Sequence, residues 1–285
     1  MQSNPEYRIV KLKSGTHSVH SLSHGETFHP VIGPTAEAES LYVRQLKLVD
    51  RLRNHPGEFV IWDVGLGSAA NALTVLRATC EISSLIRLVS FDATLEPLRF
   101  GLQHARPLGY FAGFEDSVNK LLTEHQVTFR NSRQQVEWML QVGDFPAMLT
   151  QTAAQSFAKP HVIMFDPYSP AKNPSMWTVP LFNSLFLLLD QSRPCALPTY
   201  SRSTMLRVTL LVAGFYVGVG HATGEKEETT IAANSMHLIN EPLDRRWLGR
   251  ALRSTSAEPM QEPTYKQAPL SSKTWEILKA HPQFK

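Results

Sequence analysis

The sequence lacks the features that mark several whole classes of protein. Its only two cysteines, Cys80 and Cys195, exclude a disulfide framework. No apolar run approaches the roughly 18 residues that a membrane helix needs, and the N-terminus shows no apolar stretch of a signal peptide. Charge of one sign is scarce, because 28 basic and 25 acidic residues leave a net charge of only +3, which does not by itself argue for a nucleic-acid partner. These absences predict a cytoplasmic protein without a membrane segment.

The length and the apolar pattern predict one α/β core. A chain of 285 residues, 42% of them apolar, can bury a full core. From Glu58 onward, short apolar runs such as FVIWDV, LIRLVSF and HVIMFD alternate with helical stretches, which is the βαβ pattern of a parallel sheet. The runs FYVGVG and TTIAA predict an antiparallel pair at its end. We expect a Rossmann-like core over residues 58–240, with a mostly parallel sheet and an antiparallel last strand.

An N-terminal extension, residues 1–57, is expected to precede this core. Two β-prone stretches, 7–13 and 16–22, flank a Ser-Gly turn signal and predict a hairpin. A helix is expected from about 36 to 53, ended by the sequence Asn-His-Pro-Gly.

A C-terminal tail, residues 241–285, is expected to follow the core. Its five prolines predict an extended segment apart from a short helix over 273–279. Arginines gather in residues 243–253 beside a tryptophan, and this run favours a solvated helix face over a contact with phosphate and base.

A glycine loop follows the first strand of the core. Gly65 and Gly67 lie at the turn into a helix whose first turn contains Asn71. Glycine lets the backbone approach a ligand, and the start of a helix offers free N–H donors. Ala70 occupies the third glycine position of a dinucleotide fingerprint, so the loop alone suits more than one cofactor.

Three aspartates favour S-adenosylmethionine as that cofactor. Asp92 ends the next strand, where a ribose diol needs a carboxylate, and Asp144 lies farther along, where an adenine amino group needs an acceptor. Asp63, just before the glycines, is placed to order the loop that faces the methionine part. Each aspartate alone is equally compatible with a helix cap, but all three together favour a methyl donor.

A proline-rich loop with the sequence DPYSPAKNPSMW starts at Asp166, at the carboxyl end of a strand, where open α/β sheets bind their ligands. The Asp166 carboxylate would accept a hydrogen bond from an amine and direct its lone pair at the methyl group. Tyr168 would stack on a base or contact the donor, and Lys172 and Asn173 would contact the acceptor backbone or stabilise the loop. The alternative is a rigid connection with Trp177 in the core.

The segment FDPYSPAKNPSMWTVPLF resembles the signature of the tRNA 5-methylaminomethyl-2-thiouridine methyltransferases, D-[AG]-F-[AS]-P-x-[KR]-N-P-x-M-W. The segment GETFHPVIG at 25–33 and the segment ALPTYSR at 196–202 resemble further parts of that family, and the likeness covers about residues 7–234.

This resemblance implies transfer of the methyl group of S-adenosylmethionine to the aminomethyl nitrogen at C5 of a wobble uridine in tRNA. It implies a donor site lined by Gly65, Gly67, Asn71, Asp92 and Asp144, with Asp166 facing the amine and His29 near the substrate. Proteins of this family also carry a flavin-dependent oxidase half, for which 285 residues leave no room, so a stand-alone methyltransferase is expected.

The chain departs from the family pattern at two places that bear on the acceptor. Pro167-Tyr168 replaces a small residue and Phe, and Glu225-Lys226-Glu227 stands where the family has a basic run. Three other functions stay open: methylation of a different amine, aminopropyl transfer as in spermidine synthase, and RNA binding without catalysis. The histidines at 17, 20, 24 and 29 lack the paired spacing of a zinc site, so no metal is expected.

Overall fold

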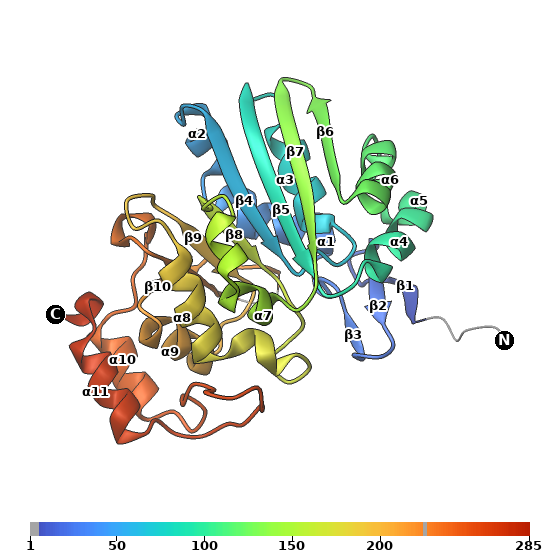
Figure 1. Cartoon of the computed structure of the whole chain (residues 1–285). Helices are drawn as coiled ribbons and strands as arrows, with labels where there is room; N and C mark the ends of the chain where they lie inside the picture. The colour runs from blue at the N-terminus through green and yellow to red at the C-terminus, as the bar shows by residue number, and fades with distance from the viewer. Residues whose placement is uncertain (1–5, 225–226) are drawn as a thin grey trace. The chain divides into compact units, whose positions relative to one another are not determined.

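The computed structural model describes residues 6–224 and 227–285, and Figure 1 shows the whole chain. It divides into two compact units. The first unit is built from the described residues of 1–144, 164–168 and 222–227, and the second from 145–163, 169–221 and 228–285. Glu225 and Lys226, part of the predicted departure from the family pattern, lie outside the described residues.

The first unit opens with a small antiparallel sheet. Strand β1 (Tyr7–Lys11) pairs with β2 (His17–Ser21), and β2 pairs with the short β3 (Glu26–Thr27). The predicted hairpin is confirmed.

The single helix expected from 36 to 53 is wrong, because the chain forms three pieces there. These are α1 (Pro34–Ala38), the π-helix η1 (Glu39–Arg44) and α2 (Leu48–Arg53). Lys47 separates the last two, with a left-handed φ of 49° that ends one helix and starts the next. Neither glycine nor proline marks this break, so no local signal predicts it.

The main sheet of the first unit has the order β8-β4-β5-β7-β6. Strands β4 (Glu58–Val64), β5 (Ser84–Asp92) and β7 (Gln134–Val142) run parallel, and β6 (Gln126–Asn131) pairs antiparallel with β7. Helix α3 (Ala70–Thr79) follows the glycine loop and lies against one face of the sheet (Figure 1). The remaining helices of this unit, which join β5 to β6, are α4 (Glu96–Gln103), α5 (Ala105–Leu108) and α6 (Glu115–Glu124).

The β6-β7 hairpin is absent from the elements expected from sequence. Its signal is an alternation in β7, where Val136, Trp138 and Leu140 are buried and the residues between them are half-buried or exposed. This strand brings its carboxyl end beside that of β5, since the Gly143 N–H donates to the Asp92 carbonyl at 2.8 Å.

The sheet of the second unit has the order β10-β11-β9-β8. Strand β8 (Val162–Phe165) runs parallel to β9 (Ala196–Thr199), and β11 (Thr229–Ala233) lies antiparallel between β9 and β10 (Tyr216–Gly220). The expected mostly parallel sheet with an antiparallel last strand is confirmed. The helices of this part are α7 (Phe145–Thr150), η2 (Thr152–Ser156), η3 (Pro174–Trp177), α8 (Val179–Leu188), α9 (Thr204–Val212) and η4 (Met236–Leu238).

The C-terminal segment belongs to the second unit and contains more helix than the extended tail expected from sequence, while the short helix expected over 273–279 is confirmed. It forms α10 (Arg245–Leu252), α11 (Ser272–Ala280) and η5 (Pro282–Phe284). The Gln283 side chain accepts from the Val217 N–H at 2.8 Å and donates to the Val217 and Leu243 carbonyls at 2.7 and 2.9 Å. The prolines stand between or at the starts of these helices, where proline is compatible with helical structure.

Among the residues that the structure describes, no helix combines the length and the apolar character needed to cross a bilayer.

Candidate active site

The glycine loop after β4 packs directly against the backbone of Asp166. The Gly65 N–H donates to the Phe91 carbonyl at 3.0 Å, and Gly65 has a φ of +88°. A Cβ added to Gly65 would lie 2.8 Å from the Asp166 carbonyl oxygen. Only glycine therefore fits here, both for its backbone conformation and for the close approach of the two chain segments.

Asp92 lies beside this loop at the end of β5. Its carboxylate accepts from the Gly67 N–H at 2.9 Å and from the Thr94 N–H at 3.2 Å. Burial raises the pKa of Asp92, although these backbone N–H groups oppose the shift. A carboxylate has about four acceptor sites, so Asp92 keeps the capacity to accept from a ribose diol.

Asp144 comes two residues after β7 and is exposed. The N–H of its neighbour Gly143 donates a hydrogen bond to the Asp92 backbone carbonyl, so both aspartates lie at the same edge of the sheet. A contact between Asp144 and adenine remains a prediction.

The Asp166 carboxylate is held by two side chains from distant parts of the sequence. Its Oδ2 accepts from the Asn71 Nδ2 at 2.7 Å and lies 2.9 Å from the His29 Nε2. The Asn71 Oδ1 lies 3.2 Å from the same His29 nitrogen. Asp166 and His29 side chains are 13% and 10% exposed, so this group is shielded from water without being sealed.

This arrangement favours the protonated form of His29. Burial alone lowers the pKa of His29, but the Asp166 carboxylate, its hydrogen bond and the Glu37 charge outweigh that effect and raise the pKa to about 9. His29 also adopts a left-handed φ of 48°, which is uncommon for a residue with a side chain. This uncommon backbone conformation accompanies the contact between the His29 imidazole and Asp166.

Asp63 lies in β4 and is fully buried. Its Oδ2 accepts from the Ser90 hydroxyl at 2.9 Å, and Ser90 in turn accepts from the Trp138 indole N–H at 2.9 Å. Burial, with the charges of Asp166 and Asp92, raises the pKa of Asp63 to about 7 despite the Ser90 hydrogen bond. Asp63 thus ties β4 to β5 beneath the loop, and its expected part in ordering that loop stays a prediction.

Tyr168 lies in a cluster of rings. It stacks on His24 with ring centroids 3.9 Å apart and meets Phe28 edge-on at 5.6 Å. A Cβ added to Gly67 would lie 3.1 Å from the Phe28 ring, so this cluster reaches the glycine loop. Sequence reasoning missed His24 and Phe28 as site residues, although Phe28 belongs to the segment 25–33, whose His29 it had singled out, and His24 directly precedes that segment.

Lys172 and Asn173 belong to the second unit. Their backbone N–H groups both donate to the Ser169 carbonyl at 2.9 Å, and the Asn173 side chain accepts from Ser175 at 2.9 Å. These bonds shape the proline-rich loop. A contact of either residue with the acceptor remains a prediction. The buried Trp177 has its ring 6.0 Å from that of Tyr200, so the loop ends in the core of this unit.

Three of the N-terminal histidines contact different residues. His20 bonds Thr27 through Nδ1 at 2.8 Å, while His24 stacks on Tyr168 and His29 bonds Asp166. In the described part of the chain, no three His, Cys, Asp or Glu side chains form a group able to hold a metal ion.

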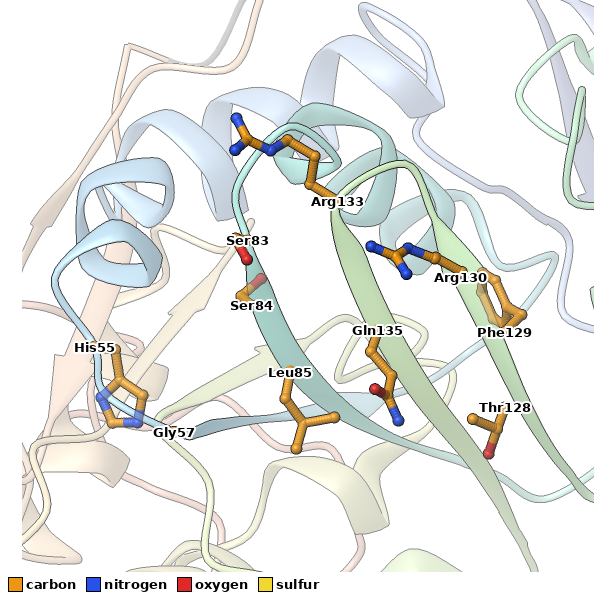
Figure 2. A pocket seen from close by; sticks show the side chains of 10 residues that line it. All are labelled: His55, Gly57, Ser83, Ser84, Leu85, Thr128, Phe129, Arg130, Arg133 and Gln135. Atoms are coloured by element: carbon orange, nitrogen blue, oxygen red, sulfur yellow. The ribbon is translucent and has the colours of Figure 1, made fainter.

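A groove of about 640 Å³ lies at the opposite edge of the first unit's sheet (Figure 2). It is lined by residues that precede β4, by residues around the start of β5 and by residues of the β6-β7 hairpin, including His55, Ser84 and Arg133. The groups described above follow the carboxyl ends of the strands, about 20 Å away along a seven-residue strand. The groove is therefore separate from the candidate site.

Comparisons with known proteins agree with this geometry. A family model described as S-adenosyl-L-methionine-dependent methyltransferase matches residues 112–235. The tRNA 5-methylaminomethyl-2-thiouridine biosynthesis bifunctional protein MnmC of Aeromonas hydrophila is 28% identical over 221 residues, which cover 73% of this chain and 32% of that protein. The MnmC protein of Methylibium petroleiphilum is 28% identical over 231 residues, which cover 78% of this chain and 34% of that protein. This chain spans about a third of the length of these relatives.

A solved structure shows the same fold. The crystal structure of MNMC2 from Aquifex aeolicus superposes with a TM-score of 0.67 at 20% identity, over 97% of this chain and 84% of that chain. Together with the sequence matches, the glycine loop and the strand order, this shows that the chain has the Rossmann-like fold of S-adenosyl-L-methionine-dependent methyltransferases and is similar in sequence to part of MnmC.

Proposed function

We propose that this methyltransferase acts on tRNA, converting 5-aminomethyl(-2-thio)uridine at the wobble position to 5-methylaminomethyl(-2-thio)uridine. The observation that carries the proposal is the Asp166 carboxylate, held by His29 and Asn71 beside the glycine loop. An amine acceptor needs such a group beside the methyl donor, and the sequence relatives are named for this tRNA modification.

The donor site is assigned to the first unit. S-adenosylmethionine, when bound, supplies a methyl group on a positively charged sulfur, which makes that methyl electrophilic. The backbone of Gly65 and Gly67 fits a closely approaching ligand, since a Cβ at either position would meet Asp166 or Phe28. Asp92 takes the ribose in this proposal, Asp144 the adenine, and Asn71 and Asp63 support the loop.

Asp166 orients the acceptor amine. Both of its side-chain contacts described above use Oδ2, so we assign Oδ1 to accept a hydrogen bond from the aminomethyl group. This bond directs the nitrogen lone pair toward the methyl carbon. Transfer forms the new N–C bond, breaks the S–C bond with its electrons left on sulfur, and leaves an extra proton on nitrogen, which passes to the carboxylate or to water.

His29 keeps the Asp166 carboxylate in place. A protonated imidazole at Nε2 donates to Oδ2 and compensates the carboxylate charge, which is costly to bury alone. His29 approaches the acceptor in this proposal, together with Tyr168, Lys172 and Asn173. A tRNA substrate also favours a location in the cytoplasm.

One assay with two substrates tests the acceptor. Given tRNA that bears 5-aminomethyluridine, the protein should add one methyl group, and given the carboxymethylaminomethyl form it should add none, because that nitrogen is already substituted. The rate should rise with pH until the bound amine is mostly uncharged.

Nucleoside mass spectrometry reads out both reactions. If small amines are methylated well and aminomethyl-tRNA is ignored across the pH range, the acceptor is a different amine and the tRNA assignment is wrong, while the methyltransferase assignment stands.

A further inference from the structure

The net positive charge of the chain is concentrated in its last 45 residues. Residues 241–285 contain eight basic and five acidic side chains, whereas residues 1–240 contain 20 of each. Helix α10 contributes the densest part of this charge. The first turn of this helix contains no acidic residue. The N-cap before it is Asp244, whose carboxylate already accepts from the Trp247 N–H at 2.7 Å.

Helix α10 places its arginines on the side away from the core. Arg246, Arg250 and the C-cap Arg253 follow one another at spacings of four and three residues, so they share one helix face, and all three are exposed. The opposite face carries Trp247, Leu248 and Ala251, all buried. The indole is thus part of the core and does not stack on a base.

Among the described residues, no carboxylate forms an ion pair with any of these three guanidinium groups. The ion pairs of the described chain involve other residues. Three unpaired like charges on one face repel one another, and no fold contact explains them. Guanidinium groups bind phosphate oxygens through paired N–H donors. A row of phosphates is the ligand that this row of arginines fits.

We infer that the α10 face formed by Arg246, Arg250 and Arg253 binds the phosphate backbone of the tRNA acceptor. The inference rests on the proposed function, because it takes tRNA as the partner. It places a charged contact in a segment beyond residues 112–235, which the family model matches. Contacts of this kind add affinity without reading base sequence.

The test compares two triple variants of the full chain. The first is Arg246→Gln/Arg250→Gln/Arg253→Gln, in which glutamine keeps a comparable helix propensity. The matched control is Arg53→Gln/Arg99→Gln/Lys120→Gln, which removes three exposed cations that are paired with acidic side chains on their own helices. Both variants lower the net charge equally.

Filter binding of tRNA bearing 5-aminomethyluridine is measured between 50 and 200 mM salt, with calorimetric binding of S-adenosylmethionine as the check on folding. We expect the α10 variant to bind tRNA roughly 10- to 100-fold more weakly and to lose about two to three from the slope of log affinity against log salt. The control should change both quantities far less.

The possible failures are distinguishable. If the α10 variant binds tRNA with the affinity and salt slope of the unaltered protein, or no more weakly than the control, the inference is overturned while methylation of tRNA still supports the proposed function. If the unaltered protein binds and methylates no tRNA, both are overturned. If the triple variant no longer binds S-adenosylmethionine, it has not folded correctly, and tRNA binding is then measured on the single Arg250→Gln variant. An unchanged salt slope in that variant overturns the inference.

Discussion

The substitution Asp166→Asn separates the chemical role of the carboxylate from its shape. Asparagine keeps the side-chain size and an oxygen that accepts from Asn71, but it removes the negative charge at a site only 13% exposed. The same change removes the group that holds the proton on His29. Two observables should therefore move together: the rate of methyl transfer and the pKa of His29.

The size of the second effect follows from the structure. The pKa of His29 stands at about 9 against an ordinary 6.5, and among the causes that raise it the Asp166 carboxylate comes first. A difference of this size corresponds to about 3 kcal/mol favouring the protonated imidazole. Without Asp166, burial dominates and lowers the pKa, so we expect the His29 pKa in the variant to fall to its ordinary range or below it.

The same pair predicts how stability depends on pH. Because the folded-state pKa of His29 is raised, its contribution is fully present below the unfolded pKa of about 6.5 and is lost as the pH rises through 9. Urea unfolding of the unaltered protein should therefore show a decline in the free energy of unfolding over this window. The Asp166→Asn variant should lack most of that decline.

Three measurements make up the assay. Single-turnover methyl transfer should slow by about 10²-fold or more, calorimetry should show nearly unchanged S-adenosylmethionine affinity, and an NMR titration of the histidine side chains should report the lowered pKa. Asp50→Asn, at an exposed helix position, is the control. A variant that turns over normally refutes the role of Asp166, and an unmoved His29 pKa refutes the electrostatic reasoning.

Three further substitutions test neighbouring parts of the site. Asp92→Ala should weaken S-adenosylmethionine binding by about 1–3 kcal/mol in calorimetry, through lost charge-assisted hydrogen bonds; unchanged affinity would remove Asp92 from the donor site. Gly65→Ala should lower the free energy of unfolding by about 1–3 kcal/mol and impair donor binding, because a φ of +88° and a contact at 2.8 Å oppose any side chain; a stable variant with full affinity would contradict the close approach. The raised pKa of Asp63 means that the protonated carboxyl stabilises the folded protein, and that this stabilisation is lost as the pH rises from about 4 through about 7. The Asp63→Asn variant cannot titrate at this position, so it should lack this pH-dependent decline in the free energy of unfolding. An unchanged pH profile in urea unfolding would mean that Asp63 titrates normally.

Local sequence was sufficient to predict much of the fold. The apolar run at 58–64 predicted a buried strand, and the glycines after it predicted a sharp turn, because both signals depend on a few adjacent residues. The expectation failed where the deciding contacts are remote. The general expectation of an extended tail did not hold at helix α10, although the arginine run at 243–253 already favoured a helix there. The break at Lys47 has no local signal.

The candidate site divides in the same way. The sequence by itself indicated Asp166, Asn71 and His29 as separate members of a family-like pattern, and it indicated the cofactor through three aspartates that accompany the glycine loop. The tertiary structure decided that a single oxygen of Asp166 meets both other side chains, which are 95 and 137 residues away along the chain. It also decided that the pKa of His29 is raised, because a pKa depends on burial and on the charges around the group, and folding alone sets both.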